Sequence, residues 1–185
     1  MNLPNAITVA RIFLVPLLVV VLLTKFEGKQ ILGVRHELVG AAIFAIAALT
    51  DWLDGYLARR RQQVTTFGQL MDPLADKLLI TAAFVSLVQL DLAPAWMVAV
   101  ILGREFLVTV LRSIAASRGI VIAASPMGKL KMASEVTTIL ALILGHEYMP
   151  PLFVIGIVAL WASLITAVVS GVDYYRKFSG LLSRQ

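Results

Sequence analysis

Long apolar runs separated by short charged segments dominate the chain as far as about residue 175. The longest uncharged run covers residues 148–172, and the other apolar runs are shorter and end at charged residues. A membrane span needs about 20 mostly apolar residues. Pro73, Pro94 and Pro126 fall near the starts of predicted helices, where proline is tolerated. The pattern predicts six transmembrane helices, at about residues 6–26, 37–61, 69–90, 94–117, 126–145 and 149–175.

The composition supports a membrane protein and excludes several other classes. Hydrophobic residues make up 59% of the 185 residues and charged residues 15%, and the mean hydropathy is +0.89. A soluble domain averages roughly 45–50% apolar and about 25% charged residues. The formal charge of +5 is spread between apolar runs, which argues against nucleic-acid binding, and the absence of cysteine excludes thiol chemistry. We expect one all-α, polytopic membrane domain over residues 1–185.

The first apolar run is interpreted as a retained span rather than a signal peptide. Its uncharged core, residues 12–24, has the length of a signal-peptide apolar region. However, Arg11 lies inside the helical pattern, and Lys25 and Glu27 stand where a small-residue cleavage site would follow. The first span is therefore expected to stay in the membrane.

Basic residues are concentrated on one side of the predicted topology. The opposite side carries Asp91, His146 and Glu147 with no Lys or Arg, and the first loop is mixed in charge. Because cytoplasmic loops are rich in Lys and Arg, we expect a multi-pass protein of the cytoplasmic membrane with both termini in the cytoplasm. The basic residues on the predicted cytoplasmic side are Arg59, Arg60, Arg61, Arg112, Arg118, Lys129, Lys131, Arg176, Lys177 and Arg184.

Four of the eleven acidic residues form two pairs around a short polar turn. Asp51 and Asp54 lie near the end of one predicted helix, and Asp72 and Asp76 near the start of the next. Residues three or four apart share a helix face, so each pair projects two carboxylates together. Four carboxylates in a low dielectric repel one another unless protons or cations neutralise them. Oxygen ligands without His or Cys favour hard ions, so we predict two divalent cations, Mg²⁺ or Mn²⁺.

Neighbouring residues fit a phosphorylated substrate at this cytoplasm-facing site. Two-metal sites suit in-line displacement at phosphorus. Gly55 lets a substrate approach the backbone, although a glycine there also suits helix packing. Arg59, about one turn later, can pair with a diphosphate, and Thr65 offers a hydroxyl donor.

The aspartates and their neighbours resemble the full signature of the CDP-alcohol phosphotransferase family: Asp51-x2-Asp54-Gly55-x2-Ala58-Arg59-x8-Gly68-x3-Asp72-x3-Asp76. The resemblance implies a six-helix membrane enzyme, usually a homodimer, in which the hydroxyl of an alcohol displaces CMP from a CDP-activated donor. It implies that the four aspartates ligate metal and that Asp76 is also the general base. It further implies that Gly55, Arg59 and Thr65 bind the cytidine diphosphate part of the donor.

A second set of charges interrupts the later helices. Arg104 and Arg112 lie two turns apart on a similar face, and Lys129 and Lys131 open the next predicted helix. A cationic pocket beside a metal site favours an acceptor with its own anion, most simply a phosphate. Two alternatives stay open. Arg112, Lys129 and Lys131 can contact lipid headgroups, and Arg104 can pair with Glu105 or Glu135.

Three segments are similar to the phosphatidylglycerophosphate synthases of bacteria, a branch of the same family. This similarity implies CDP-diacylglycerol as donor and sn-glycerol 3-phosphate as acceptor. Met132 departs from the pattern, which has Thr there. Asn5, Thr8 and Arg11 share a helical stripe and either line the edge of the site or anchor the first helix. The similar segments are Leu3-Pro4-Asn5-Ala6-Ile7-Thr8-x2-Arg11, Arg104-Glu105-Phe106-x2-Thr109-x2-Arg112 and Gly128-Lys129-x-Lys131.

Three other functions are alternatives to phosphatidyl transfer onto glycerol 3-phosphate. Another member of the family with an inositol phosphate acceptor would also need cations, whereas serine would not. A cation or proton transporter would carry membrane carboxylates, but here they gather at one end of the helices. A scaffold protein would not need all four aspartates.

Overall fold

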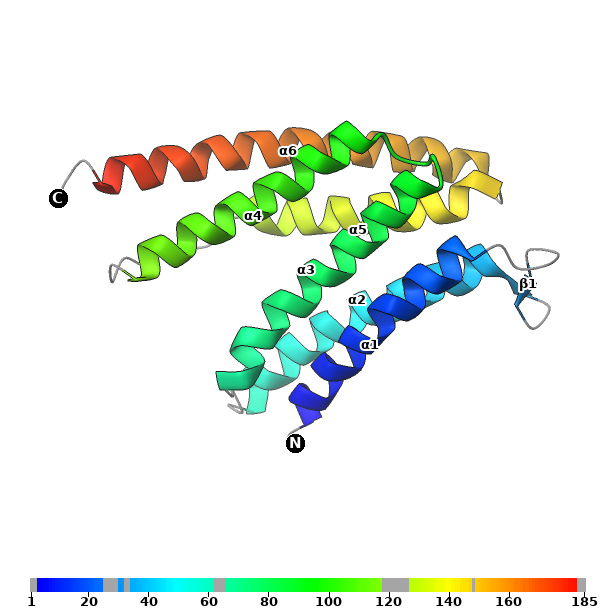
Figure 1. Cartoon of the computed structure of the whole chain (residues 1–185), viewed down its shortest axis with the longest axis horizontal. Coiled ribbons are helices and arrows are strands. Elements are labelled where there is room, and N and C mark those ends of the chain that lie inside the picture. Colours follow the sequence, from blue (N-terminus) through cyan, green and yellow to red (C-terminus); the bar gives the residue numbers. More distant parts are fainter. Residues whose placement is uncertain are drawn as a thin grey trace.

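The computed structural model of the chain describes residues 3–24, 30–31, 34–61, 66–117, 127–147 and 149–182. The side chains of residues 3–5, 30–31, 51–61, 66–70, 127–129, 147 and 181–182 lie outside this description. The described chain is almost entirely helical (Figure 1). Its elements are α1 (Leu3–Leu23), β1 (Gln30–Ile31), β2 (Val34–Arg35), α2 (His36–Arg61), α3 (Thr66–Gln89), α4 (Ala95–Ser117), α5 (Met127–Glu147) and α6 (Pro150–Leu182).

The helices confirm the all-α prediction, with differences in detail. Each bound lies within three residues of its predicted position, except that α6 continues to Leu182. Lys177 Nζ lies 2.7 Å from Asp173 Oδ2 one turn earlier, and such a pair supports the added turns. The antiparallel pair of β1 and β2 was not predicted, because two-residue strands leave almost no periodic signal.

Pro73 was expected near the start of a helix, and this expectation is wrong. It lies inside α3, because the helix already begins at Thr66. Proline cannot donate a backbone hydrogen bond, but membrane helices tolerate it where neighbouring groups satisfy the freed carbonyl. The residue stands between Asp72 and Asp76, which are two of the candidate site residues.

The helices form two groups of three (Figure 1). In the first group α1 packs against α2 and α3, and in the second α6 packs against α4 and α5. The groups meet where α5 contacts α2 and α3 and where α3 contacts α4. The ends of α2, α4 and α6 lie on the same side of the view as the starts of α3 and α5. Residues far apart in sequence therefore meet at one end of the bundle.

One apolar core joins all six of the described helices. Between α5 and α6 the packing is especially close at Gly145, where an added Cβ would collide with the backbone of Phe153. Burial of large side chains supplies most of the stability of such a bundle. The core includes Leu18 of α1, Phe44 of α2, Phe84 of α3, Ile101 of α4, Leu142 of α5 and Leu164 of α6.

The outer surface carries many large apolar side chains. Phe13, Val158 and Ile165 are 72%, 63% and 59% exposed, a degree of apolar exposure that suits contact with lipid. Among the described residues, two helical segments are long and apolar enough to cross a membrane, Ala6–Leu23 and Pro150–Gly180. The outer surface therefore agrees with the membrane character that the composition indicates.

Candidate active site

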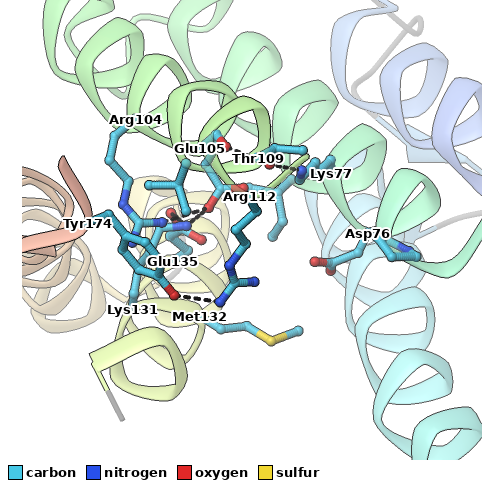
Figure 2. A pocket seen from close by; sticks show the side chains of 13 residues that line it. Asp76, Lys77, Arg104, Glu105, Thr109, Arg112, Lys131, Met132, Glu135 and Tyr174 are labelled. Carbon is cyan, nitrogen blue, oxygen red and sulfur yellow. Dashed lines mark hydrogen bonds and ion pairs between the residues drawn. The ribbon is translucent and has the colours of Figure 1, made fainter. Parts of the chain in front are cut away.

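A pocket of about 360 Å³ lies between α3 and the second group of helices (Figure 2). Four cationic and three acidic side chains line it. Ionisable groups inside a helical membrane bundle are costly and usually serve a function. The lining residues are Pro73, Asp76, Lys77, Ile80, Arg104, Glu105, Val108, Thr109, Arg112, Lys131, Met132, Glu135 and Tyr174.

Two of the predicted aspartates have described side chains on α3. Figure 2 shows the Asp76 carboxylate directed across the pocket toward Arg112. Asp72 lies one turn earlier, and its Oδ1 accepts a hydrogen bond from Thr8 Oγ1 at 2.5 Å. Thr8 is 1% exposed, so this bond fixes one carboxylate oxygen of Asp72 from the neighbouring helix α1. The expectation that Thr8 lies at the edge of the candidate site is consistent with this contact.

The remaining donor and metal residues lie partly or wholly outside the described residues. The backbone of Asp51, Asp54, Gly55 and Arg59 belongs to α2, but their side chains are not described, and Thr65 falls outside altogether. Because α2 contacts α3, the two aspartate pairs lie on adjacent helices. The side chains of Asn5 and Lys129 also lie outside the description.

The described residues supply two carboxylates of the kind that bind divalent ions. Asp72 and Asp76 supply carboxylate oxygens one turn apart, which is a ligand type that Mg²⁺ prefers. Among the described residues, no group of three or more His, Cys, Asp or Glu side chains forms a complete site. The two carboxylates thus fit part of a ligand set that Asp51 and Asp54 would complete.

Lys131 lies between two glutamates at the inner wall of the pocket. Its Nζ contacts Glu105 of α4 and lies 3.1 Å from Glu135 Oε1, one turn along α5. The side chains of Lys131 and Glu135 are only 6% and 3% exposed. The positive charge of Lys131 is therefore matched by carboxylates, and its side chain is more buried than that of Arg112.

Arg104 pairs with Glu105, one of the two glutamates considered from the sequence. The distance from Arg104 Nη1 to Glu105 Oε1 is 3.9 Å. Its Nε is buried and has no hydrogen-bond partner among the residues that the structure describes. Buried donors normally have a partner, so this guanidinium retains capacity for a further acceptor.

Arg112 and Lys77 contact hydroxyl groups instead of carboxylates. Arg112 Nη2 donates a 2.5 Å hydrogen bond to the Tyr174 hydroxyl, and Lys77 Nζ donates to Thr109 Oγ1. Neither hydroxyl carries a charge that neutralises the cation it contacts. This wall of the pocket suits a ligand that carries its own negative charge.

Tyr174 and Lys77 are pocket residues that the sequence patterns did not single out. Tyr174 lies at the far end of the last predicted helix, outside any motif, and Lys77 lies outside the signature, directly before an apolar run. A weak signal existed for Lys77, since it follows Asp76 directly. For Tyr174, only the packing of α6 against α4 reveals the contact.

The protein is a helical bundle with an apolar outer surface and a pocket lined by cationic and acidic side chains. A model of the CDP-alcohol phosphatidyltransferase family matches residues 1–169, and the chain belongs to this family. Members of the family use divalent metal ions.

Curated relatives are similar over nearly the whole chain. One is a CDP-diacylglycerol–glycerol-3-phosphate 3-phosphatidyltransferase of Bacillus subtilis, 46% identical over 95% of this chain and 94% of its own length. A Rickettsia typhi protein of the same name is 33% identical over 95% of this chain and 96% of its own length. A probable phosphatidylglycerophosphate synthase of Mycobacterium tuberculosis is 42% identical over 94% of this chain and 79% of its own length.

Proposed function

We propose that this protein transfers the phosphatidyl group of CDP-diacylglycerol to sn-glycerol 3-phosphate. The products are phosphatidylglycerophosphate and CMP. The observation that carries the proposal is the pocket in which the Asp76 carboxylate faces Arg112 (Figure 2). A candidate base and a candidate anion site thus share one cavity. The names of the similar proteins, which specify this pair of substrates, support it.

The reaction is an in-line displacement at phosphorus. Asp76 takes the proton from the acceptor hydroxyl as its oxygen attacks the phosphorus that bears the diacylglycerol. A new oxygen–phosphorus bond forms, and the bond to the bridging oxygen breaks, so that CMP leaves with that oxygen. Divalent ions held by Asp51, Asp54, Asp72 and Asp76 would neutralise the charge of the diphosphate when bound.

The two substrates are assigned to different walls of the site. Gly55, Arg59 and Thr65 would hold the cytidine diphosphate part of the donor beside the aspartates of α2 and α3. Arg104 and Arg112 would bind the phosphate of the acceptor, together with Lys129 and Lys131. Guanidinium groups suit this task because their planar N–H groups pair with two phosphate oxygens at once. The compensated charge of Lys131 favours the arginines as the main contacts.

We also propose the setting in which this enzyme works. The whole chain would form one domain with six spans in the cytoplasmic membrane, both termini in the cytoplasm, and two copies would associate as a homodimer. The gathering of helix ends on one side of the bundle supports a site that faces the cytoplasm (Figure 1). The exposed apolar side chains suit surrounding membrane lipids.

The test is CMP release by the purified protein in detergent with CDP-diacylglycerol and Mg²⁺. We expect release only when sn-glycerol 3-phosphate is added, with phosphatidylglycerophosphate as the lipid product. Release with an inositol phosphate instead would keep the reaction class and overturn the acceptor. Absence of release with any alcohol, from protein shown to be folded, would overturn the enzymatic proposal and favour ion transport.

A further inference from the structure

Tyr174 connects the two arginines of the pocket. Its hydroxyl oxygen accepts the 2.5 Å hydrogen bond from Arg112 Nη2. Its ring lies beneath both guanidinium groups, with the Cζ atoms of Arg112 and Arg104 at 5.2 Å and 5.7 Å from the ring centroid. Figure 2 shows the three side chains together at one wall. Only 4% of Tyr174 is exposed, so its position is fixed by the packing of α6.

Gly171 allows this contact, because it lies three residues before Tyr174 on the same face of α6. A Cβ at Gly171 would lie 3.2 Å from Cγ of Arg104, closer than most side-chain contacts allow. The missing side chain lets the aliphatic part of Arg104 lie against α6. Arg104 therefore packs against α6 at two places one turn apart: its aliphatic part lies beside Gly171, and its guanidinium lies over the Tyr174 ring.

The chemistry of this contact differs from that of Lys131. A glutamate holds a cation and also cancels its charge, as Glu105 and Glu135 do for Lys131. A phenol ring attracts a guanidinium through its quadrupole and accepts a hydrogen bond while remaining neutral. Tyr174 therefore restricts both arginines without neutralising them. A long side chain ordered before binding loses less conformational entropy when an anion arrives.

We propose that Tyr174 is a positioning residue that orders Arg112 and Arg104 for the phosphate of the acceptor. The identity of that phosphate rests on the proposed function, whereas the ordering of the arginines does not.

The test compares Tyr174→Phe with the matched control Tyr175→Phe. Tyr175 is the next residue and is 61% exposed, so its hydroxyl should be dispensable. For Tyr174→Phe we expect the KM for sn-glycerol 3-phosphate to rise about tenfold, the factor given by an ordinary hydrogen bond to a charged group. The kcat and the KM for CDP-diacylglycerol should stay unchanged, and the Tm should fall only slightly because a single hydrogen bond is lost. Tyr174→Leu, which also removes the ring, should raise the same KM further.

A double-mutant cycle shows whether Tyr174 acts through Arg112. In the Arg112→Lys background, Tyr174→Phe should add little, because the contact is already lost. An unchanged acceptor KM in Tyr174→Phe would overturn the proposal. So would an equal loss in both backgrounds, or a rise in the KM of both substrates together.

A binding measurement separates this inference from the enzymatic assignment. Inorganic phosphate should raise the Tm of the detergent-solubilised wild type, and Tyr174→Phe should need about tenfold more phosphate for the same shift. If the wild type makes no phosphatidylglycerophosphate but shows this difference, the proposed function fails and the positioning role stands. Equal phosphate dependence of the two proteins would overturn the positioning role.

Discussion

Thr8 of α1 donates a hydrogen bond to Asp72 of α3, at 2.5 Å between Oγ1 and Oδ1. The two residues are 64 positions apart, and the threonine is buried. A buried hydroxyl that holds one oxygen of a carboxylate limits the directions in which the other oxygen can point. Groups that orient a metal ligand typically affect metal affinity about 10- to 100-fold.

The first prediction concerns this bond. Thr8→Val keeps the shape of the side chain and removes the hydroxyl, so Asp72 should turn more freely. We expect the Mg²⁺ concentration for half-maximal CMP release to rise about tenfold. Thr8→Ser retains the donor and should behave like the wild type. Equal Mg²⁺ dependence of the valine and serine variants would show that the bond has no role in metal binding.

The second prediction concerns the proposed base. Asp76→Asn keeps the size of the side chain but cannot accept the proton and is a weaker metal ligand. CMP release should fall by at least about 10²-fold, the lower range for loss of a general base. Asp173→Asn is the control, because Asp173 forms an exposed pair with Lys177. Substantial turnover by folded Asp76→Asn would remove Asp76 from the mechanism.

The third prediction compares a buried and an exposed ion pair with the same helical spacing. Lys131→Met leaves the buried Glu135 without its ion-pair partner and Glu105 with Arg104 alone, which should destabilise the protein by about 3–5 kcal/mol. Lys177→Met breaks an exposed pair and should cost less than about 0.5 kcal/mol.

The comparison is made by thermal unfolding in one detergent. A large loss of Tm confined to Lys131→Met would assign this lysine to the stability of the α4–α5 contact. If Lys131→Met instead keeps its Tm and loses only affinity for sn-glycerol 3-phosphate, the lysine binds substrate and the stability prediction is wrong.

The fourth prediction concerns the contact between α5 and α6. An added Cβ at Gly145 would collide with the backbone of Phe153, which cannot move aside as a side chain can. Gly145→Ala should therefore destabilise the protein by about 1–3 kcal/mol. Gly103→Ala is the matched control, because nothing lies within 4 Å of a Cβ built there. Removing a helical glycine at that open position should stabilise the protein by about 0.5–1 kcal/mol.

Sequence patterns were sufficient for the helices but not for all the contacts between them. Charged residues and prolines mark the limits of the apolar runs, so most helix bounds could be placed closely. The end of α6 was missed because it depends on polar helical turns rather than on hydropathy. The position of Pro73 was predicted wrongly for a related reason. The first residues of α3 are polar, so hydropathy places the start of the helix too late.

The candidate site shows the same division. Asp72 and Asp76 could be proposed as site residues because they lie one turn apart in a local motif. The pairing of Lys131 with Glu105 joins two helices, and spacing along the chain cannot show which cation a glutamate will meet. Tyr174 is a stronger case, because it meets Arg112 from 62 residues away. Contacts of this kind depend on how helices pack, which no local pattern encodes.

The residues proposed for donor cleavage and those proposed for acceptor binding lie mainly on different groups of helices. The aspartates belong to α2 and α3, whereas Arg104, Arg112 and Tyr174 belong to α4 and α6. Under the proposed roles, substitutions in the last three helices would change the head group that is accepted while leaving the aspartates intact. Lys77 of α3 also lines the pocket, so it would have to suit the new alcohol as well. Exchange of α4–α6 between relatives would accordingly be a route to enzymes that make different phospholipids.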